Sequence, residues 1–233
     1  ALNLFGLCCS SLGKLEKAER IFDHVVREAP HISEAKLHLA NCRFEQDKLE
    51  LALAALKGED RANPTDPESL IMLARIHMAL GRKDEAKHAL QDALRTDPKR
   101  PETLLAMAGI QLALGDLTES MALCKKVLFD DPQNCNALIG QAEVDNQREH
   151  WDAVLANTRA VLEQFPAHIR AWYLHCVALD KLDRPVEFLA ATREMAACAP
   201  DDVDVLTLLC HAHHKNQDYV ACILAANEVL SQQ

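Results

Sequence analysis

The stretch PESLIMLARIHMALGRKDEAKHALQDALRTDP, residues 67–98, decides the fold because the proline at its end recurs along the chain at a fixed interval. Successive prolines stand 34 residues apart, without an insertion or deletion, at Pro30, Pro64, Pro98, Pro132, Pro166 and Pro200. A constant period of this size is typical of solenoids, in which each unit is a pair of helices stacked on the next pair. We number each unit so that its proline is position 32.

Position 8 of every unit carries a small residue: Gly6, Ala40, Ala74, Ala108, Ala142, Cys176 and Cys210. Two helices approach closely where no side chain is larger than cysteine, so we expect the two helices of a unit to cross there. We therefore expect Ala108→Leu to overpack this crossing and to lower the free energy of unfolding by about 1 to 3 kcal/mol.

Three further positions support a two-helix unit. Position 15, where one helix must stop and the chain reverse, holds Gly13, Gly81 and Gly115, with Asp47, Glu149, Asp183 and Gln217 in the other units. Position 20 reads Ala18, Ala52, Ala86, Ser120, Val154, Phe188 and Cys222, and position 24 reads Phe22, Leu56, Leu90, Cys124, Thr158, Thr192 and Ala226. Units with a larger residue at position 20 tend to have a smaller one at position 24, which indicates that the two side chains fill one shared volume of the core.

These columns resemble a tetratricopeptide repeat. Within residues 67–98 the pattern matches at Leu70, Leu73, Ala74, Gly81, Ala86, Leu90, Ala93 and Pro98. The resemblance covers essentially the whole chain and weakens in the fifth and sixth units. It implies an all-α, right-handed superhelical α-solenoid of stacked antiparallel helix-turn-helix repeats.

We expect a single continuous array without an internal domain boundary. Its units would be residues 1–32, 33–66, 67–100, 101–134, 135–168, 169–202 and 203–233. In the second unit, Gly58 and Glu59 replace small apolar residues, so we expect its second helix to end early or bend. Both ends fall inside a unit, which favours a piece of a longer array.

Composition narrows the class of partner. The net charge is −10, aromatic residues make up 4% of the chain, and no run of lysine or arginine occurs, so we expect no nucleic-acid partner. No apolar stretch is long enough to span a bilayer, so we expect no membrane insertion. A partner that is a protein or peptide, either apolar, amphipathic or basic, fits better.

The nine cysteines include no C-x-x-C pair, and their number is odd. Six lie in columns otherwise filled by small or apolar residues: Cys8, Cys42, Cys124, Cys176, Cys210 and Cys222. We expect them to be reduced and buried, which favours a reducing compartment and hence a cytoplasmic location.

The sequence contains no recognisable catalytic motif. No nucleophile motif, glycine-rich phosphate loop or H-E-x-x-H element occurs, and the acidic pairs at residues 130–131 and 201–202 fit turns and helix caps. His211, His213 and His214 form the only dense cluster of potential ligands, but a third ligand on the same face as His211 and His214 is not obvious. We expect no enzyme activity, no cofactor and no metal, and leave open whether this histidine cluster binds anything.

The resemblance implies that positions 2, 5, 9 and 12 of the first helices line a concave groove. The predicted peptide-binding residues are Leu37, Asn41, Phe44, Ile71, Arg75, Met78, Leu105, Leu112, Ile139, Glu143, Asn146 and Tyr173. They describe an apolar strip in units two to four, followed by a polar end, with Glu34, Glu68 and Glu102 as an acidic rim. Alternatively, the apolar residues at positions 5 and 12 simply pack between adjacent first helices.

The leading functional hypothesis is a non-catalytic scaffold that binds a peptide or helical segment of a partner in this groove. Family members that clamp acidic C-terminal tails carry lysine and asparagine at positions 5 and 9, whereas position 5 is apolar here in units two to five, so that clamp is not expected. One alternative is the substrate-recognition arm of a larger enzyme. Another is self-association through the end helices, since the last expected helix, residues 218–230, has few polar residues.

Overall fold

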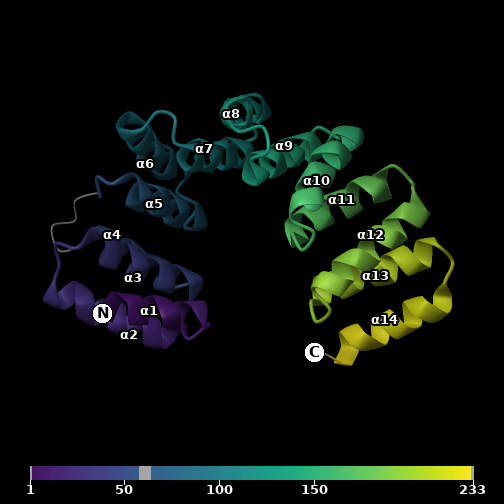
Figure 1. Ribbon diagram of the computed structural model, residues 1–233, viewed down its shortest axis with the longest axis horizontal. Coiled ribbons are helices and arrows are strands. Elements are labelled where there is room, and N and C mark those ends of the chain that lie inside the picture. The colour runs from purple at the N-terminus through teal and green to yellow at the C-terminus, as the bar shows by residue number, and fades with distance from the viewer. Residues whose placement is uncertain (1, 58–63, 232–233) are drawn as a thin grey trace. The chain divides into compact units, whose positions relative to one another are not determined.

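The computed structural model describes residues 2–57 and 64–231 of the chain. These residues form fourteen α-helices and no β-strand (Figure 1), which confirms the prediction of an all-α helical repeat. They group into two compact units, residues 1–115 and 116–233. The single continuous array stays a prediction, and the expected early end or bend at Gly58 and Glu59 lies outside the described residues.

The first compact unit, which we call the N-terminal unit, holds seven helices. They are α1 (Leu2–Ser11), α2 (Leu15–Glu28), α3 (Ser33–Glu45), α4 (Leu49–Lys57), α5 (Pro67–Ala79), α6 (Lys83–Thr96) and α7 (Pro101–Leu114). Each of α1, α3 and α5 packs on the helix that follows it. The first helices also contact one another, α1 with α3, α3 with α5 and α5 with α7, so they form one layer.

The second compact unit, which we call the C-terminal unit, also holds seven helices. They are α8 (Leu117–Asp130), α9 (Cys135–Gln147), α10 (Trp151–Gln164), α11 (Ile169–Lys181), α12 (Pro185–Cys198), α13 (Val203–Lys215) and α14 (Tyr219–Ser231). Each helix packs on the next along the chain, and α9 also contacts α11. Adjacent antiparallel helices thus repeat in both units.

The turn within each hairpin keeps one backbone conformation although its residue changes. Gly13, Gly81 and Gly115 have positive φ angles of 71°, 74° and 84°. The residues that replace glycine at position 15 adopt the same left-handed conformation, with φ between 52° and 61°: Asp47, Glu149, Asp183 and Gln217. Such residues cost roughly 1 kcal/mol or more in this region, so tertiary packing rather than local preference sets the turn.

The acidic pairs act at turns and helix starts as predicted. The Asp202 carboxylate accepts the backbone N–H of Val205 at 3.1 Å and caps α13, whereas Asp131 accepts the backbone N–H of Gln133 at 3.3 Å in the turn before α9. Each carboxylate satisfies an N–H group that has no partner within a helix.

The small residues of position 8 lie where the predicted crossings are. Those of the first six hairpins are buried, and the last, Cys210, is half-buried. A Cβ added at Gly6 would lie 2.7 Å from the Phe22 ring, so the glycine makes room for the large residue at position 24. Positions 20 and 24 are likewise buried in the first six hairpins, which supports the shared core volume.

The cysteine prediction is partly wrong. Cys42, Cys124 and Cys176 are buried, and burial raises the pKa of Cys124 to about 11 and that of Cys176 to about 12. Cys8, however, is exposed, because α1 packs only on α2 and α3 and leaves the side that carries Cys8 uncovered. Cys210 and Cys222 are half-buried.

The part of the chain that the structure describes contains neither a membrane-spanning helix nor a cluster of metal ligands. None of its helices has both the length and the apolar character needed to cross a membrane. Nor do three or more His, Cys, Asp or Glu side chains of these residues come together as they would to hold a metal ion.

Candidate functional site

The N-terminal unit contains an apolar pocket of about 330 Å³ on the layer of first helices. Phe44 comes from the last turn of α3, and Arg75 and Met78 lie three residues apart on one face of α5. The remaining lining residues are Ala74, Ala79, Leu90, Ala106, Gly109 and Ile110. Three predicted groove residues from two different repeats therefore meet at one cavity.

The pocket exists because α7 carries small residues where α5 carries large ones. Gly109 occupies the same repeat position as Arg75, and a Cβ built at Gly109 would meet no atom within 4 Å. Ala106, one turn earlier on α7, also lines the pocket. The predicted groove residues include neither, because the groove wall was expected to consist of larger apolar and polar side chains. A glycine at position 9, inside a helix, was the available signal.

Arg75 is held at the edge of this pocket by an aromatic ring. Its guanidinium carbon lies 5.0 Å from the centre of the Phe44 ring, and Nη1 lies 4.0 Å from the Met72 sulfur. A guanidinium over a ring face is attracted by the negative face of the π system. The pocket thus combines an apolar lining with one positive charge in a defined place.

The other predicted residues of this unit lie on the same helices outside the pocket. All are half-buried: Leu37, Asn41, Ile71, Leu105 and Leu112. Because α3, α5 and α7 contact one another, half-burial fits packing between first helices as well as a groove wall.

The four predicted residues of the C-terminal unit have different environments. Ile139 is 6% exposed and belongs to the hydrophobic core. Glu143 is half-buried and accepts a hydrogen bond from Arg170, and Asn146 is half-buried with its Oδ1 atom enclosed. Tyr173 is exposed. Glu143 and Tyr173 therefore present polar groups, whereas Ile139 offers almost no surface.

The acidic rim is partly neutralised by an arginine that the sequence prediction missed. Arg100 Nη2 lies 2.7 Å from Glu68, and Arg100 Nε lies 3.4 Å from Glu102. The hydrogen bond from Arg100 lowers the pKa of Glu68. Glu34 lies 3.4 Å from His38. The available signal was the place of Arg100, directly before the unit that begins at Pro101.

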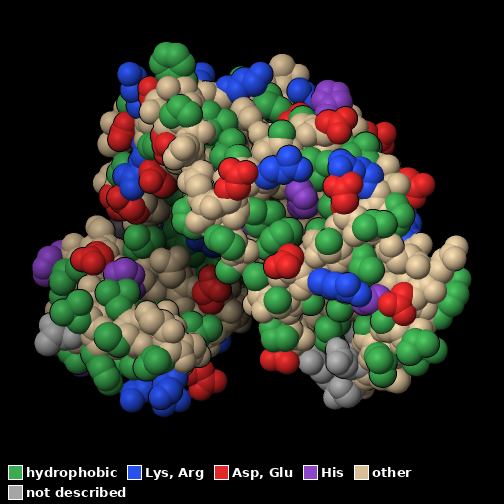
Figure 2. All heavy atoms as spheres, turned by 45° about the vertical axis from the view of Figure 1, so that its right-hand side comes forward, with side chains coloured by type: hydrophobic (Ala, Val, Ile, Leu, Met, Phe, Trp, Pro, Cys, Tyr) green, Lys and Arg blue, Asp and Glu red, His purple; other side chains and the backbone are tan. Residues whose placement is uncertain are grey.

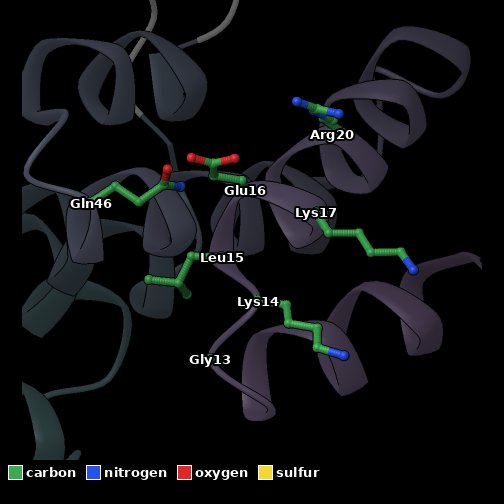
Figure 3. A pocket seen from close by; sticks show the side chains of 7 residues that line it. All are labelled: Gly13, Lys14, Leu15, Glu16, Lys17, Arg20 and Gln46. Carbon is green, nitrogen blue, oxygen red and sulfur yellow. The ribbon is translucent and has the colours of Figure 1, made fainter.

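A wider cavity of about 710 Å³ lies at the turn between α1 and α2, where most of the lining residues are charged or polar. Its residues are Gly13, Lys14, Leu15, Glu16, Lys17, Arg20 and Gln46. Figure 3 shows Lys14 and Lys17 extending away from Gln46, while Arg20 points in another direction. Since these charged groups do not converge, they do not define a common ligand position.

The predicted histidine cluster is divided by the structure. His213 is buried, with Nδ1 3.3 Å from Asp218. His211 and His214 are exposed and line a pocket of about 550 Å³, but each ring packs on an aromatic neighbour, Phe188 at 5.6 Å and Tyr219 at 6.0 Å between centroids. Only two of the three histidines therefore share a surface.

Charged side chains of both signs share the surface. On the face shown in Figure 2, Lys and Arg side chains lie among Asp and Glu side chains over most of the area. Surfaces that bind a phosphate backbone carry a basic patch or stripe instead of such a mixture of charges.

Comparison with known families identifies the repeat. A tetratricopeptide repeat model matches residues 11–67 and 71–134, about half of the chain, and a second tetratricopeptide repeat model matches residues 44–95. The chain belongs to the tetratricopeptide repeat family. A search of curated protein sequences gave no significant match.

Solved structures share this tetratricopeptide repeat (TPR) fold. A TPR protein from Parabacteroides merdae matches with a TM-score of 0.71 and 16% identity, over 99% of this chain and 91% of that one. TTC0263, a TPR protein of Thermus thermophilus, matches with a TM-score of 0.68 and 22% identity, over 76% of this chain and 97% of that one.

A third match is a chain in the crystal structure of the APC/C hetero-tetramer Cut9–Hcn1. The TM-score is 0.76 and the identity 16%, over 91% of this chain and 42% of that chain. At these identities the three likenesses show the fold alone.

Proposed function

We propose that this TPR chain is a non-catalytic protein-interaction scaffold that binds an amphipathic segment of a partner protein on the first helices of its N-terminal unit. The observation that carries the proposal is the apolar pocket that Phe44, Arg75 and Met78 line together with Gly109 of α7. TPR proteins as a family bind protein partners, which is in keeping with this role.

The size and lining of the pocket favour a side chain over a cofactor. A volume of about 330 Å³ is at the lower end for small-molecule sites, and Met78, Leu90 and Ile110 supply an apolar surface. One or two apolar side chains of a helix would fill it. Arg75 and Asn41 would then contact polar groups of the ligand beside that anchor.

The glutamates at the starts of α3, α5 and α7 favour a basic residue in the part of the bound segment that lies beyond the pocket, whose own charged residue is Arg75. Glu34 and Glu102 are exposed, and the single guanidinium of Arg100 serves both Glu68 and Glu102. One unit of negative charge therefore remains on that pair. We include Leu37, Ile71, Leu105 and Leu112 as apolar surface beside the pocket, and Glu143, Asn146 and Tyr173 as a separate polar surface on the C-terminal unit.

The test compares two apolar-to-acidic changes in the same unit. Proteins captured from a cell extract by the immobilised chain would be identified, and the bound segment would then be titrated as a synthetic peptide. We expect Met78→Asp to weaken peptide binding at least about tenfold, because a carboxylate would enter an apolar pocket. Leu51→Asp, which changes an exposed residue of α4, is the matched control and should change binding less than about twofold. Equal affinities for Met78→Asp and wild type, with intact helicity, would contradict the proposal.

Exposed apolar side chains on the two end helices favour a second candidate function, self-association. The residues concerned are Leu2, Leu4, Phe5, Tyr219, Val220, Ile223, Leu224 and Leu230. Sedimentation equilibrium of wild type, Ile223→Lys and the control Val186→Lys, an exposed residue of α12, tests this. A concentration-dependent oligomer that only Ile223→Lys dissociates supports self-association, and a monomer at all concentrations excludes it.

A further inference from the structure

The last hairpin brings two thiols into contact. Cys210 on α13 and Cys222 on α14 have their sulfur atoms 3.2 Å apart, and the Cys210 sulfur lies 3.5 Å from the backbone oxygen of Cys222. The repeat explains this contact, because Cys210 occupies position 8 and Cys222 position 20, the two columns that meet where the helices of a unit cross.

Only this hairpin carries cysteine in both columns. The corresponding pairs in the other six units are Gly6 and Ala18, Ala40 and Ala52, Ala74 and Ala86, Ala108 and Ser120, Ala142 and Val154, and Cys176 and Phe188. Alanine would satisfy the close crossing in the last unit as it does elsewhere. Packing alone therefore does not account for a thiol on each helix.

We propose that Cys210 and Cys222 form a redox modification site, at which a low-molecular-weight disulfide such as glutathione disulfide oxidises the dithiol to an intrachain disulfide. A bond between the sulfurs requires a separation of about 2.05 Å, so the two atoms must approach by only about 1.1 Å from their present 3.2 Å.

The reaction proceeds by two thiol–disulfide exchanges. One cysteine thiolate attacks a sulfur of the small disulfide, which forms a mixed disulfide and releases one small thiolate. The second cysteine thiolate then attacks the protein sulfur of that mixed disulfide and expels the other small thiolate. Overall the protein dithiol loses two protons and two electrons, and the small disulfide gains them as two thiols.

A pocket beside the two sulfur atoms gives a small disulfide access to them. Both cysteines line the pocket of about 550 Å³ at the end of the C-terminal unit, together with Thr207, His211, His214, Ala226 and Leu230. A small disulfide can reach the sulfurs through this opening, and the protons that the thiols release pass to water. The buried thiols of Cys42, Cys124 and Cys176 have no such access.

Disulfide formation would fasten α14 to α13. The bond joins residues 12 positions apart in the chain and spans the hairpin turn, so local separation of α14 would be suppressed. The oxidised and reduced forms would therefore differ in the mobility of the last helix and in the shape of the pocket beside it.

The experiment uses the full chain, reduced and then treated with glutathione disulfide. Thiol titration and peptide mapping without reductant should show the loss of two thiols and a bond between residues 210 and 222, reversed by dithiothreitol. Amide hydrogen exchange in α14 should slow at least about tenfold on oxidation. Cys210→Ala and Cys222→Ala should abolish the bond and keep the fold, since alanine fills these columns in other units.

Cys198→Ala, which removes an exposed thiol of α12, is the matched control and should leave the bond unchanged. Three outcomes would overturn the proposal: no loss of thiols, a bond between other cysteines in place of this one, or a glutathione adduct that persists on Cys210 or Cys222. Because wild-type mapping needs no variant, the result does not depend on the folding of the alanine variants.

Discussion

The first helices of the two compact units use the same repeat positions for different surfaces. In the N-terminal unit, position 9 carries Arg75 and Gly109, and with Met78 at position 12 these residues open an apolar pocket. In the C-terminal unit, position 9 of α9 carries Glu143, held by Arg170, and position 12 carries Asn146. The core columns are filled in both units. The repeat therefore fixes backbone and core, whereas positions 9 and 12 of the first helices differ between the units.

The largest expected effect comes from filling the pocket, which removes the difference between the first helices of the two units. Gly109→Leu should weaken binding of the partner peptide about ten- to a hundredfold, because the new side chain occupies the cavity in place of the ligand. Thermal stability should stay the same or rise, since leucine favours a helix more than glycine does.

Ala54→Leu is the control for Gly109→Leu because it adds similar volume on the exposed side of α4. Calorimetric titration with the captured peptide measures both variants. Undiminished binding to Gly109→Leu, in a folded protein, would place the ligand elsewhere.

A second prediction sharpens the claim that the cores are equivalent. Ala40→Leu in the N-terminal unit and Ala142→Leu in the C-terminal unit should each lower the free energy of unfolding by about 1 to 3 kcal/mol, because both alanines are buried at helix crossings. Chemical denaturation measures the loss. A change below about 0.5 kcal/mol in one unit alone would show that its crossing is loosely packed.

A third prediction concerns an ion-pair network of the N-terminal unit. Glu19 on α2 is 16% exposed and accepts hydrogen bonds from Arg43 at 2.9 Å, Lys48 at 2.8 Å and Gln46 at 3.1 Å, so it ties α2 to α3 and to the turn after α3. Burial alone would raise its pKa, but these hydrogen bonds and the charge of Lys48 outweigh burial and lower it. Glu19→Gln should cost about 1 to 2 kcal/mol at pH 7.

The pH dependence of that cost has a definite sign. A carboxyl group with a lowered pKa in the folded state stabilises it fully above the unfolded pKa, and this contribution is lost as the pH falls through the folded pKa. Urea unfolding should therefore show Glu19→Gln and wild type converging at low pH. Glu50→Gln, which removes a charge from an exposed pair with Arg82, is the control and should change stability by less than about 0.5 kcal/mol. A cost for Glu19→Gln that does not depend on pH would contradict the assignment.

The smallest effect is expected where Glu143 is paired. Arg170 is 67% exposed in the side chain, so Arg170→Ala should change stability by no more than about 0.5 kcal/mol. Thermal unfolding measures this change. A loss above about 1.5 kcal/mol would make the pair part of the scaffold rather than of a surface that a ligand can use.

The fold followed from the sequence because its determinants repeat. Local steric constraints require a small residue at position 8 and favour proline at position 32. Seven units in register make this pattern visible in the sequence. Even turns without glycine, such as Glu149 and Gln217, keep the left-handed conformation, since the packed helices on either side impose it.

The candidate site was only partly predictable. Phe44, Arg75 and Met78 were predicted because they are large side chains at groove positions of the repeat. The space beside them comes from the small residues Gly109 and Ala106, which the prediction did not include. The exposure of Cys8 and the neutralising role of Arg100 depend on which neighbours lie across a helix interface. A single repeat column does not contain that information.

The most direct test of the central claim is photocrosslinking from inside the pocket. Benzoyl-phenylalanine would replace Phe44, which lines the pocket, and in a matched variant Phe129, which is exposed on α8. The proposed function predicts that the captured partner crosslinks from residue 44, through an apolar residue of an amphipathic segment, and not from residue 129. Crosslinking from residue 129 alone, or equally from both positions, would contradict it.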